Sequence, residues 1–444
     1  MLLGRVGLAW LPSLFGGAVV LMLPFTHQEL GVIQLVPLAG VLAFAIAVLG
    51  FAQSPRLPAG LALGGGLALA YGLSAQIAVF CALAATPATL WLWWPLRRSA
   101  KAWAALAAGV VLFFALVSPL LLAQLRATSD EHFVRSAETV RRHSAKPAHY
   151  LKSPWEQLLP TPGVEVAERP SSRAFWPGTL RVLLALTGLA VAWRSARWRR
   201  FGAAGALVLG SGVVLSFGGH LAVAGLSLAD VLGRLPGLGQ IRSFFRFALF
   251  AQLAVAALAA GGVHWLQGQA RRRWATAALP ARVAAQTALG ALALVAVLEM
   301  RPGPMRIEPL PPLDRELPWL TWIEEQTAPD DVLVFAPFPE GRGVRDYLAT
   351  GQWMYWQMRH WRPMVNGYSG FFPRDFKVIK EEMRTFPSQD ALRALDAAGV
   401  RYCVVPRAVI EGSPPPDPAG PFQLSMVFRD EFHELAIFEL RPVG

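Results

Sequence analysis

Charged residues are scarce in this chain. Asp, Glu, Lys and Arg make up 16% of its 444 residues, whereas an ordinary soluble domain contains about 25%. Only two residues are cysteine, Cys81 and Cys403, which excludes a disulfide-stabilised scaffold. Hydrophobic residues reach 54%, and they occur in runs of nearly bilayer length. The composition therefore excludes a soluble globular protein and a disordered chain, and it predicts an integral membrane protein.

The apolar runs predict about nine membrane-spanning helices, because a helix needs roughly 17–25 apolar residues to cross the hydrocarbon core. The predicted spans are 6–25, 31–52, 57–74, 76–95, 102–124, 176–193, 201–218, 244–265 and 281–299. The third and fourth spans form one apolar stretch interrupted near Gly72–Ser74. One long helix with a re-entrant piece is therefore an alternative to two separate spans there.

The net charge of +12 is unevenly distributed along the chain. Residues 1–300 contain 25 basic and 9 acidic residues, whereas residues 301–444 contain 16 and 20. Basic residues of the first part gather in short loops between apolar runs, which is typical of cytoplasmic loops. These loops lie at 97–101, 194–200 and 271–282. The N-terminus is thus predicted to be cytoplasmic. A nucleic-acid partner is not expected, since no basic groove with interleaved aromatic residues occurs on a soluble module.

The expected fold class is an all-α membrane bundle followed by a small extracytoplasmic α/β domain. We expect transmembrane helices in 1–124 and 176–300, an extracytoplasmic loop at 125–175 and the α/β domain at 301–444. Apolar periodicity in that domain predicts helices at 314–327, 344–359, 374–385 and 389–398 and strands at 332–335, 363–365 and 401–405. A hairpin is predicted from strands at about 424–429 and 433–440.

The extracytoplasmic loop contains candidate site residues. Residues 128–143 are predicted to form a short helix, with Thr128 or Ser129 as its N-cap and acidic residues in its first turn. Asp130 and Glu131 are candidates for a catalytic carboxylate, and helix capping is the simpler alternative. Arg141 and Arg142 are candidates for binding a phosphate or lipid headgroup at the membrane surface.

Aromatic and polar residues cluster between positions 353 and 370 of the tail. Aromatic ring faces beside polar side chains suit contact with a sugar or a lipid headgroup, and the core of the domain is the alternative interpretation. The candidate contact residues are Trp353, Tyr355, Trp356, His360, Asn366 and Tyr368. No nucleophile elbow, phosphate loop or metal-ligand spacing occurs in the tail, and no metal site is predicted.

Four stretches carry a resemblance to a known family. They are Ser144-Ala145 with Tyr150-Leu151 and Phe175-Trp176-Pro177-Gly178; Leu235-Pro236-Gly237 with Ile241-Arg242 and Arg246-Phe247; His360 to Gly370 with Phe372-Pro373; and Gly399-Val400-Arg401-Tyr402. In these stretches the chain resembles bacterial multi-pass membrane proteins of the GT-C glycosyltransferase type, including the YfhO-like group. None of the four is a catalytic motif.

The resemblance implies transfer of a sugar from a polyprenyl-phosphate donor to an envelope glycan or lipid, on the outer side of the bacterial inner membrane. It leaves a divalent metal possible as cofactor. Arg242 and Arg246 are the best phosphate candidates, because a charge at the outer mouth of a span is costly unless it faces a cavity or a lipid phosphate. Snorkelling of these side chains to the interface is the alternative.

The sequence departs from the family at the first outer loop, which is only Thr26-His27-Gln28-Glu29. Relatives carry an acidic catalytic loop there, so we expect this chain to lack the N-terminal catalytic-loop region. His27 and Glu29 are not equated with it. A non-catalytic scaffold for the assembly of envelope polysaccharide is therefore the alternative function. A transporter is less favoured, because no repeat relates the two halves of the bundle.

Overall fold

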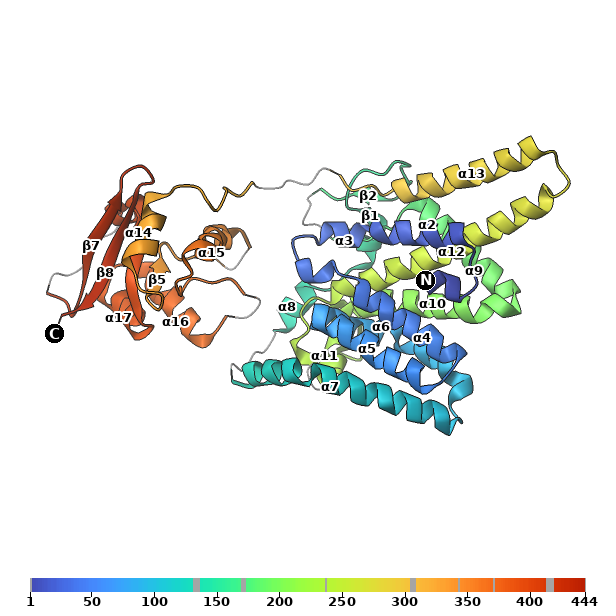
Figure 1. Ribbon diagram of the computed structural model, residues 1–444, viewed down its shortest axis with the longest axis horizontal. Helices are drawn as coiled ribbons and strands as arrows, with labels where there is room; N and C mark the ends of the chain where they lie inside the picture. Colours follow the sequence, from blue (N-terminus) through green and yellow to red (C-terminus); the bar gives the residue numbers. More distant parts are fainter. Residues whose placement is uncertain are drawn as a thin grey trace. The chain divides into compact units, whose positions relative to one another are not determined.

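The computed structural model describes residues 2–130, 136–168, 173–235, 238–303, 309–341, 344–369, 372–412 and 419–443. The chain divides into two compact units, Met1–Arg306 (unit 1) and Ile307–Gly444 (unit 2). Unit 1 is a bundle of helices, and unit 2 combines helices with a four-stranded sheet (Figure 1).

Unit 1 consists almost entirely of helices. They are α1 (Leu2–Arg5), α2 (Trp10–Leu21), α3 (Pro24–Gln28), α4 (Ala39–Gln53), α5 (Leu57–Leu73), α6 (Ala75–Trp93), α7 (Ala100–Asp130), α8 (Ala137–Arg142), α9 (Thr179–Arg194), α10 (Ala196–Ser216), α11 (Leu228–Gly233), α12 (Ala248–Arg273) and α13 (Leu279–Leu298). Two pairs of two-residue strands, β1 (Lys152–Ser153) with β2 (Glu165–Val166) and β3 (Ala222–Val223) with β4 (Leu226–Ser227), lie in the connections.

Helical structure occurs at each of the nine predicted spans. Six segments of the described chain are long and apolar enough to cross a membrane: Trp10–Gln28, Ile33–Gln53, Ala75–Leu96, Ala100–Ala127, Phe244–Arg273 and Leu279–Leu298. The three remaining helices, α5, α9 and α10, are not among them. Helices α5 and α9 have only 17 and 16 residues, and the first turns of α10 are rich in arginine. The structure thus fits a helical membrane protein, with fewer clear spans than the nine predicted.

The apolar stretch at 57–95 forms two helices rather than one. Ser74 separates α5 from α6 with an extended backbone, and its hydroxyl accepts a hydrogen bond from the Ile77 amide as the N-cap of α6. An N-cap of this kind satisfies an amide that the first turn of a helix leaves unpaired. The break therefore starts a new helix, as expected if the two segments are separate spans.

Helix α12 is the central helix of the bundle. Within its most apolar window, 83% of the residues are buried, against 17% for α7 and for α13. Small residues allow neighbouring helices to approach it closely: a Cβ atom on Gly188 of α9 would overlap the Leu258 carbonyl, and one on Gly262 of α12 would overlap the Leu184 carbonyl. Close packing of this type replaces the hydrophobic effect as the force that holds helices together in lipid.

The two ends of the bundle differ in the residues that they gather. At one end, the Trp93 indole donates to the Val48 carbonyl, and Arg200 donates to the Leu92 carbonyl (2.8 Å). These contacts bring the predicted cytoplasmic loops together. At the other end, the Tyr150 hydroxyl bonds the Ser216 hydroxyl (2.8 Å). The predicted outer segments of unit 1 therefore share one end of the bundle.

A buried pair of charged residues joins α9 to α13. The carboxylate of Glu299, just after α13, accepts hydrogen bonds from the backbone amides of Thr179 and Leu180 at the start of α9. In return, Arg181 of α9 donates to the Ala296 and Val297 carbonyls at the end of α13 (2.9 and 2.8 Å). Each side chain therefore caps the other helix, at ends whose backbone groups would otherwise be unpaired. We call this contact the Arg181–Glu299 clasp.

The short helix predicted at 128–143 is wrong in its first half. Helix α7 continues through Thr128 and Ser129 to Asp130, so neither residue is an N-cap, and Asp130 ends a helix rather than starting one. A new helix, α8, begins after Ser136, whose hydroxyl caps the Thr139 amide. The span at 102–124 simply extends beyond its apolar part, which hydropathy does not reveal. Glu131 lies outside the described residues.

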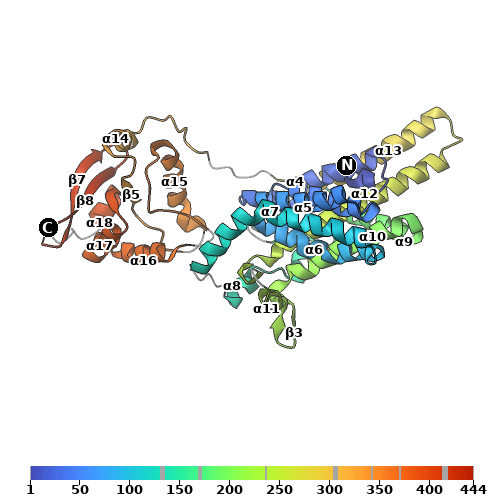
Figure 2. The ribbon, with the colours of Figure 1, turned by 60° about the horizontal axis from the view of Figure 1, so that its bottom comes forward.

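The sheet of unit 2 lies between two pairs of helices. Its order is β5 (Val332–Phe335), β6 (Val400–Pro406), β8 (Leu435–Pro442) and β7 (Phe422–Asp430); β5 is parallel to β6, and the other pairs are antiparallel. The helices are α14 (Pro318–Gln326), α15 (Leu348–His360), α16 (Arg374–Glu382), α17 (Gln389–Ala397) and the short α18 (Arg407–Gly412). Figure 2 shows α14 and α15 apart from α16 and α17 around the sheet. Leu333 and Phe335 pack with residues of α14 and α15, whereas Val334 packs with residues of α16 and α17. This alternation is the two-residue period of a strand buried on both faces.

Most elements predicted for this domain are present, including the final hairpin of β7 and β8. The strand predicted at 363–365 is reduced to a single bridge between Met364 and Leu333. The first helix starts at Pro318 rather than at 314, because proline is favourable at the first position of a helix and the preceding residue is extended.

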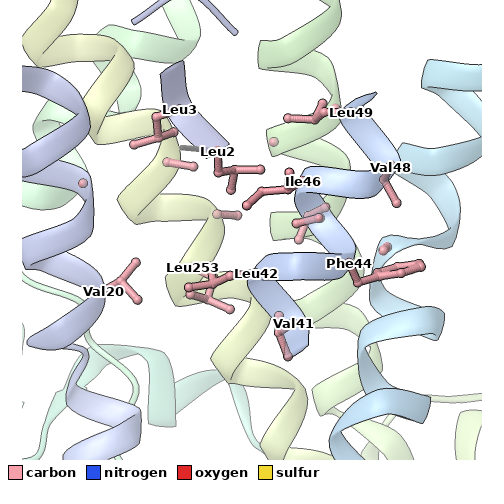
Figure 3. Close-up of a pocket in the computed structure, with 18 of the residues that line it drawn as sticks. Leu2, Leu3, Val20, Val41, Leu42, Phe44, Ile46, Val48, Leu49 and Leu253 are labelled. Atoms are coloured by element: carbon pink, nitrogen blue, oxygen red, sulfur yellow. The ribbon is translucent and has the colours of Figure 1, made fainter. Parts of the chain in front are cut away.

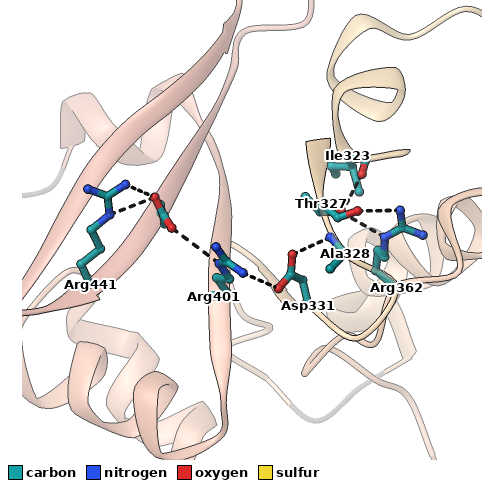
Figure 4. Close-up of polar contacts among 8 residues, drawn as sticks. Ile323, Thr327, Ala328, Asp331, Arg362, Arg401 and Arg441 are labelled. Carbon is teal, nitrogen blue, oxygen red and sulfur yellow. Dashed lines mark hydrogen bonds and ion pairs between the residues drawn. The ribbon is translucent and has the colours of Figure 1, made fainter. Parts of the chain in front are cut away.

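Two arginines that are only partly covered fix the loops of unit 2. The Arg362 guanidinium donates to the Glu324 and Thr327 carbonyls (3.0 and 2.9 Å), which closes the C-terminal end of α14. Arg401 on β6 binds the Asp331 carboxylate (3.0 Å), and that carboxylate also accepts from the Ala328 amide (Figure 4). These charged groups are engaged in holding the domain together.

Candidate functional site

Arg246 is the central residue of the candidate site. It lies in the short 3-10 turn Phe244–Phe247, immediately before α12, and only 8% of it is exposed. One terminal nitrogen donates to the Gln76 side-chain oxygen (2.6 Å), and the other lies 3.9 Å from the Glu29 carboxylate. Its Nε is buried with no partner among the described residues. A buried guanidinium with an unused donor is expensive unless a ligand completes its contacts.

Glu29 supplies a buried carboxylate beside this guanidinium. It is the C-cap residue of α3, in the loop predicted to be the first outer one, and its side chain is mostly buried. Burial raises the pKa of Glu29 above its ordinary value, and the charges of Arg246 and Arg173 oppose that rise. A carboxyl group with a raised pKa can accept and release a proton closer to neutral pH than an ordinary glutamate.

Arg173 and Arg242 complete what we call the arginine cluster, together with Arg246. Arg173 donates to the Ser144 carbonyl (3.0 Å), and its guanidinium lies 4.6 Å from the centre of the Phe245 ring. The Arg246 guanidinium lies 5.7 Å from the same ring. Burial lowers the pKa of His143, and the charges of all three arginines lower it further, so the three charges act on the same imidazole. Like charges converge in this way where they meet an anion.

Three histidines, His143, His149 and His220, line the same region. Burial lowers the pKa of each, to about 4 for His149, and neighbouring cations add to the effect. They are therefore mainly neutral at pH 7 and serve as hydrogen-bonding groups rather than as charges. The cations that act on them are Arg141, Lys146, Lys152, Arg173, Arg242 and Arg246. The site combines this positive charge with the Glu29 carboxylate, and it is suited to a polyanionic group such as a phosphate.

An apolar cavity of about 720 Å³ lies inside the bundle, among α2, α4, α6, α10 and α12 (Figure 3). Val20, Val41, Leu42, Ile46 and Leu253 point into it. The lining is almost entirely hydrocarbon, as in a site for an alkyl or prenyl chain.

The arginine cluster and the cavity share two helices. Gln76, which holds Arg246, lies in the first turn of α6, and Cys81 further along α6 lines the cavity. Arg246 precedes α12, and Phe250, four residues later, lines the cavity as well. A lipid has the two parts that these two features accept separately, an anionic head and an apolar tail.

The predicted phosphate candidates have different positions. Arg242 and Arg246 lie together in the arginine cluster. Arg141 acts electrostatically on His220 at its edge. Arg142 is exposed and pairs with Glu138 within α8 (3.7 Å), so no contact connects it with the cluster. Arg173, Gln76 and Glu29 were not among the predicted site residues, and no local pattern distinguishes them.

The segments around Ser144 and Arg246 meet at this site. The amide of Phe245 donates to the His143 carbonyl, and the Ser144 hydroxyl accepts from the Gly219 amide (2.9 Å). The segment around Ser144 is thereby fixed against the segment that contains Arg246.

The aromatic stretch of unit 2 is largely internal. Trp356 and His360 are buried in the core, and Trp353 stacks on the Phe335 ring (centroids 4.8 Å apart). Asn366 is buried and bonds both the amide and the carbonyl of Phe335 (2.7 Å each). As they lie, these side chains present little surface to a sugar, and they serve the core of the domain.

Two tyrosines of the same stretch lie differently. The Tyr355 hydroxyl donates to the Pro311 carbonyl (2.6 Å). Tyr368 is half-exposed, and its ring contacts that of Tyr347 (5.1 Å). Tyr368 is thus the member of the predicted set that remains open to an external ligand.

His360 makes the stability of unit 2 depend on pH. Burial and then the Arg362 charge lower the pKa of His360 to about 4, against an opposing effect of Glu324. Its Nδ1 accepts the Arg362 amide, a bond that protonation removes. The unfolded chain takes up this proton near pH 6.5, so stability present at neutral pH is lost as the pH falls from about 6.5 towards 4. The expected loss is about 3 kcal/mol.

Hydrogen exchange of peptides from β5 and α15, followed between pH 7 and pH 4.5, measures this effect. The variant His360→Gln keeps an acceptor for the Arg362 amide and has no titratable group, so its protection is expected to fall much less on acidification. An equal loss of protection in both proteins would contradict the assignment to His360.

No group of three or more His, Cys, Asp or Glu side chains that could hold a metal ion occurs in the part of the chain that the structure describes. Comparison of the chain with models of known families and with curated proteins gives no match.

Proposed function

We propose that this protein binds the phosphate of a membrane lipid in the arginine cluster and transfers a lipid-linked sugar to an acceptor hydroxyl. The observation that carries the proposal is Arg246, a buried guanidinium with an unpartnered Nε beside the mostly buried Glu29 carboxylate. This geometry supports an anionic ligand such as a phosphate, and the apolar cavity elsewhere in the same bundle supports a lipid tail. The sugar, and a polyprenyl chain as the tail, follow from the GT-C resemblance of the sequence.

The reaction needs one base and one electrophilic site. The acceptor oxygen forms a bond to the anomeric carbon, and the bond between that carbon and the phosphate oxygen breaks. Glu29 takes the proton of the acceptor hydroxyl. The electron pair of the broken bond stays on the lipid phosphate, where Arg246, Arg173 and Arg242 stabilise the added negative charge. The neutral histidines add hydrogen bonds to the phosphate oxygens.

The proposed setting is the bacterial inner membrane. With the N-terminus in the cytoplasm and nine crossings, the basic loops face the cytoplasm, and the arginine cluster and unit 2 face outward. Three of the nine crossings would be the shorter or more polar helices α5, α9 and α10. The short length of α5 and α9 and the arginines of α10 are compatible with crossing the membrane when neighbouring helices shield these helices or the bilayer thins around them.

A non-catalytic scaffold that binds a lipid phosphate is the second candidate. The observation that favours it is the pairing of Glu29, which already faces Arg246 and Arg173 and whose charge these arginines compensate. A paired carboxylate of this kind also occurs in purely structural sites. Binding without turnover distinguishes this candidate.

The variant Glu29→Gln tests the proposal. Purified protein in nanodiscs is given polyprenyl-phosphate sugars and candidate acceptors, and both lipid binding and product formation are measured. Loss of a general base lowers turnover by about 100-fold or more, whereas the amide preserves the shape of the site and binding persists. Glu138→Gln, on the exposed face of α8, is the matched control. Turnover retained by Glu29→Gln would exclude Glu29 as the base, and absent turnover in every protein would favour the scaffold.

The pH profile gives an independent check. Glu29 must be ionised to accept a proton, and its raised pKa means that activity falls on acidification at a higher pH than an ordinary glutamate would give. An acid limb near the pKa of a solvated glutamate, about 4.3, would contradict this role.

A further inference from the structure

Helix α15 of unit 2 and the residue after it carry four large apolar side chains that stay exposed. Leu348, Met354 and Met358 are 55%, 37% and 54% exposed, and Trp361, directly after the helix, is 78% exposed. The opposite side of the helix, with Thr350, Trp356 and His360, is buried. We refer to Leu348, Met354, Met358 and Trp361 as the α15 face. An apolar surface of this kind on a small domain marks an interaction site.

Trp361 is held in its exposed position by the backbone. Its φ of 55° is left-handed, a conformation that few residues other than glycine adopt. The backbone turns there because the Trp361 amide donates to the Gln357 carbonyl and Arg362 is fixed against α14. The indole thus stays in solvent, at a position where glycine would adopt the left-handed backbone conformation at a lower energetic cost.

The chain that leaves unit 1 is fastened to the same helix. Tyr355 donates to the Pro311 carbonyl (2.6 Å), and Arg359 donates to the Leu313 and Arg315 carbonyls. Helix α13, a candidate membrane span, ends at Leu298. Between that end and Pro311 lie roughly a dozen residues, which reach at most about 40 Å when fully extended. A short connection therefore tethers the α15 face to the end of α13, and hence to the membrane surface at which that helix would end.

We propose that the α15 face docks on the lipid bilayer beside the bundle, with Trp361 at the level of the headgroups. Tryptophan is enriched at this interface because its ring is apolar and its N–H is polar. Four side chains on one short helix face are too few for a stable protein partner, which needs about 800 Å² from each side. Tethering raises the effective concentration of the face at the membrane, so that a weak apolar contact suffices. The inference requires α13 to cross the membrane and is independent of the proposed sugar transfer.

Fluorescent labelling of the full chain in nanodiscs tests the inference. An environment-sensitive nitrobenzoxadiazole dye is attached at Met358→Cys on the α15 face or, as matched control, at Arg393→Cys on the exposed side of α17. The native Cys81 and Cys403 are buried. When nitroxide-labelled lipids replace ordinary lipids, the dye at position 358 is expected to be quenched at least twofold more than the dye at position 393. Adding Trp361→Ser to Met358→Cys is expected to reduce this difference by half or more.

Other occupants of the α15 face give different results. If unit 1 covers the face, the emission at position 358 is blue-shifted even in detergent, and lipid nitroxides do not quench it. If a second copy covers it, the blue shift depends on protein concentration, again without quenching. Either result, or equal quenching at both positions, would overturn the proposal. Hydrogen exchange confirms in each variant that unit 2 is folded.

Discussion

Replacing Arg246 by glutamine is expected to lower sugar transfer by about 100-fold or more. A preorganised charge that stabilises a leaving group typically contributes a factor of 10² to 10³ to the rate, and Arg246 is the most buried member of the arginine cluster. Arg246→Lys keeps the charge and loses the forked donor geometry, so we expect it to recover only part of the rate. Turnover and lipid-phosphate binding by the purified variants measure both effects.

Destabilisation has to be separated from lost function in this experiment. Removing Arg246 also leaves Glu29 and Gln76 without their partner, so thermal unfolding is measured in parallel. Arg242→Gln serves as a second variant, because Arg242 is only half-buried and no buried group among the described residues pairs with it. Arg142→Gln, exposed and paired within α8, is the control with an expected change of less than twofold. Equal effects at 142 and 246 would refute a phosphate site in the arginine cluster.

Gly60→Ala is expected to prevent α5 from packing against α7. A Cβ atom at Gly60 would overlap the Ala105 carbonyl, and Gly64, one turn later, lies equally close to the Gly109 carbonyl. Backbone cannot move aside as a flexible side chain does, so the two helices must separate along their length. Overpacking normally costs about 1–3 kcal/mol, and we expect the upper end of this range or more.

The matched control for this variant lies on the same helix. Gly65→Ala adds the same methyl group where nothing lies within 4 Å, and alanine favours a helix by about 1 kcal/mol over glycine. We therefore expect Gly65→Ala to keep or raise the midpoint of thermal unfolding in detergent, and Gly60→Ala to lower it by several degrees or to abolish the monodisperse protein. A similar response of the two variants would show that the contact with α7 does not matter.

The helices of this protein follow from its sequence because their signals are local. Bilayer-length apolar runs predict helical segments at all nine positions, and the two-residue alternation predicts β7 and β8 of unit 2. The predicted end of a helix is wrong where the helix continues into polar sequence, because hydropathy marks only its apolar part. Helix α7 continues past its apolar part to Asp130, since nothing in Thr128 or Ser129 stops a helix that is already formed.

The candidate site follows from the sequence only in part. The positions of Arg242 and Arg246 at the mouth of an apolar run indicate a phosphate site, because a charge is costly there. Gln76 and Arg246 are 170 residues apart, and their contact depends on the packing of α6 against its neighbours. The core role of the aromatic stretch in unit 2 has a local signal: Trp353, Trp356 and His360 recur at helical spacing on one side of α15.

The Arg181–Glu299 clasp has a consequence for the synthesis of the protein. The groups that it joins are 120 residues apart, from Thr179 to Glu299. At about 5–20 residues per second, the ribosome needs roughly 6–24 s to make that interval. During this time Arg181 can donate only to carbonyls that already exist, those of Met22 and Pro177, and the Thr179 and Leu180 amides lack the Glu299 carboxylate. The contact between α9 and α13 therefore closes only when the chain has been translated to Glu299.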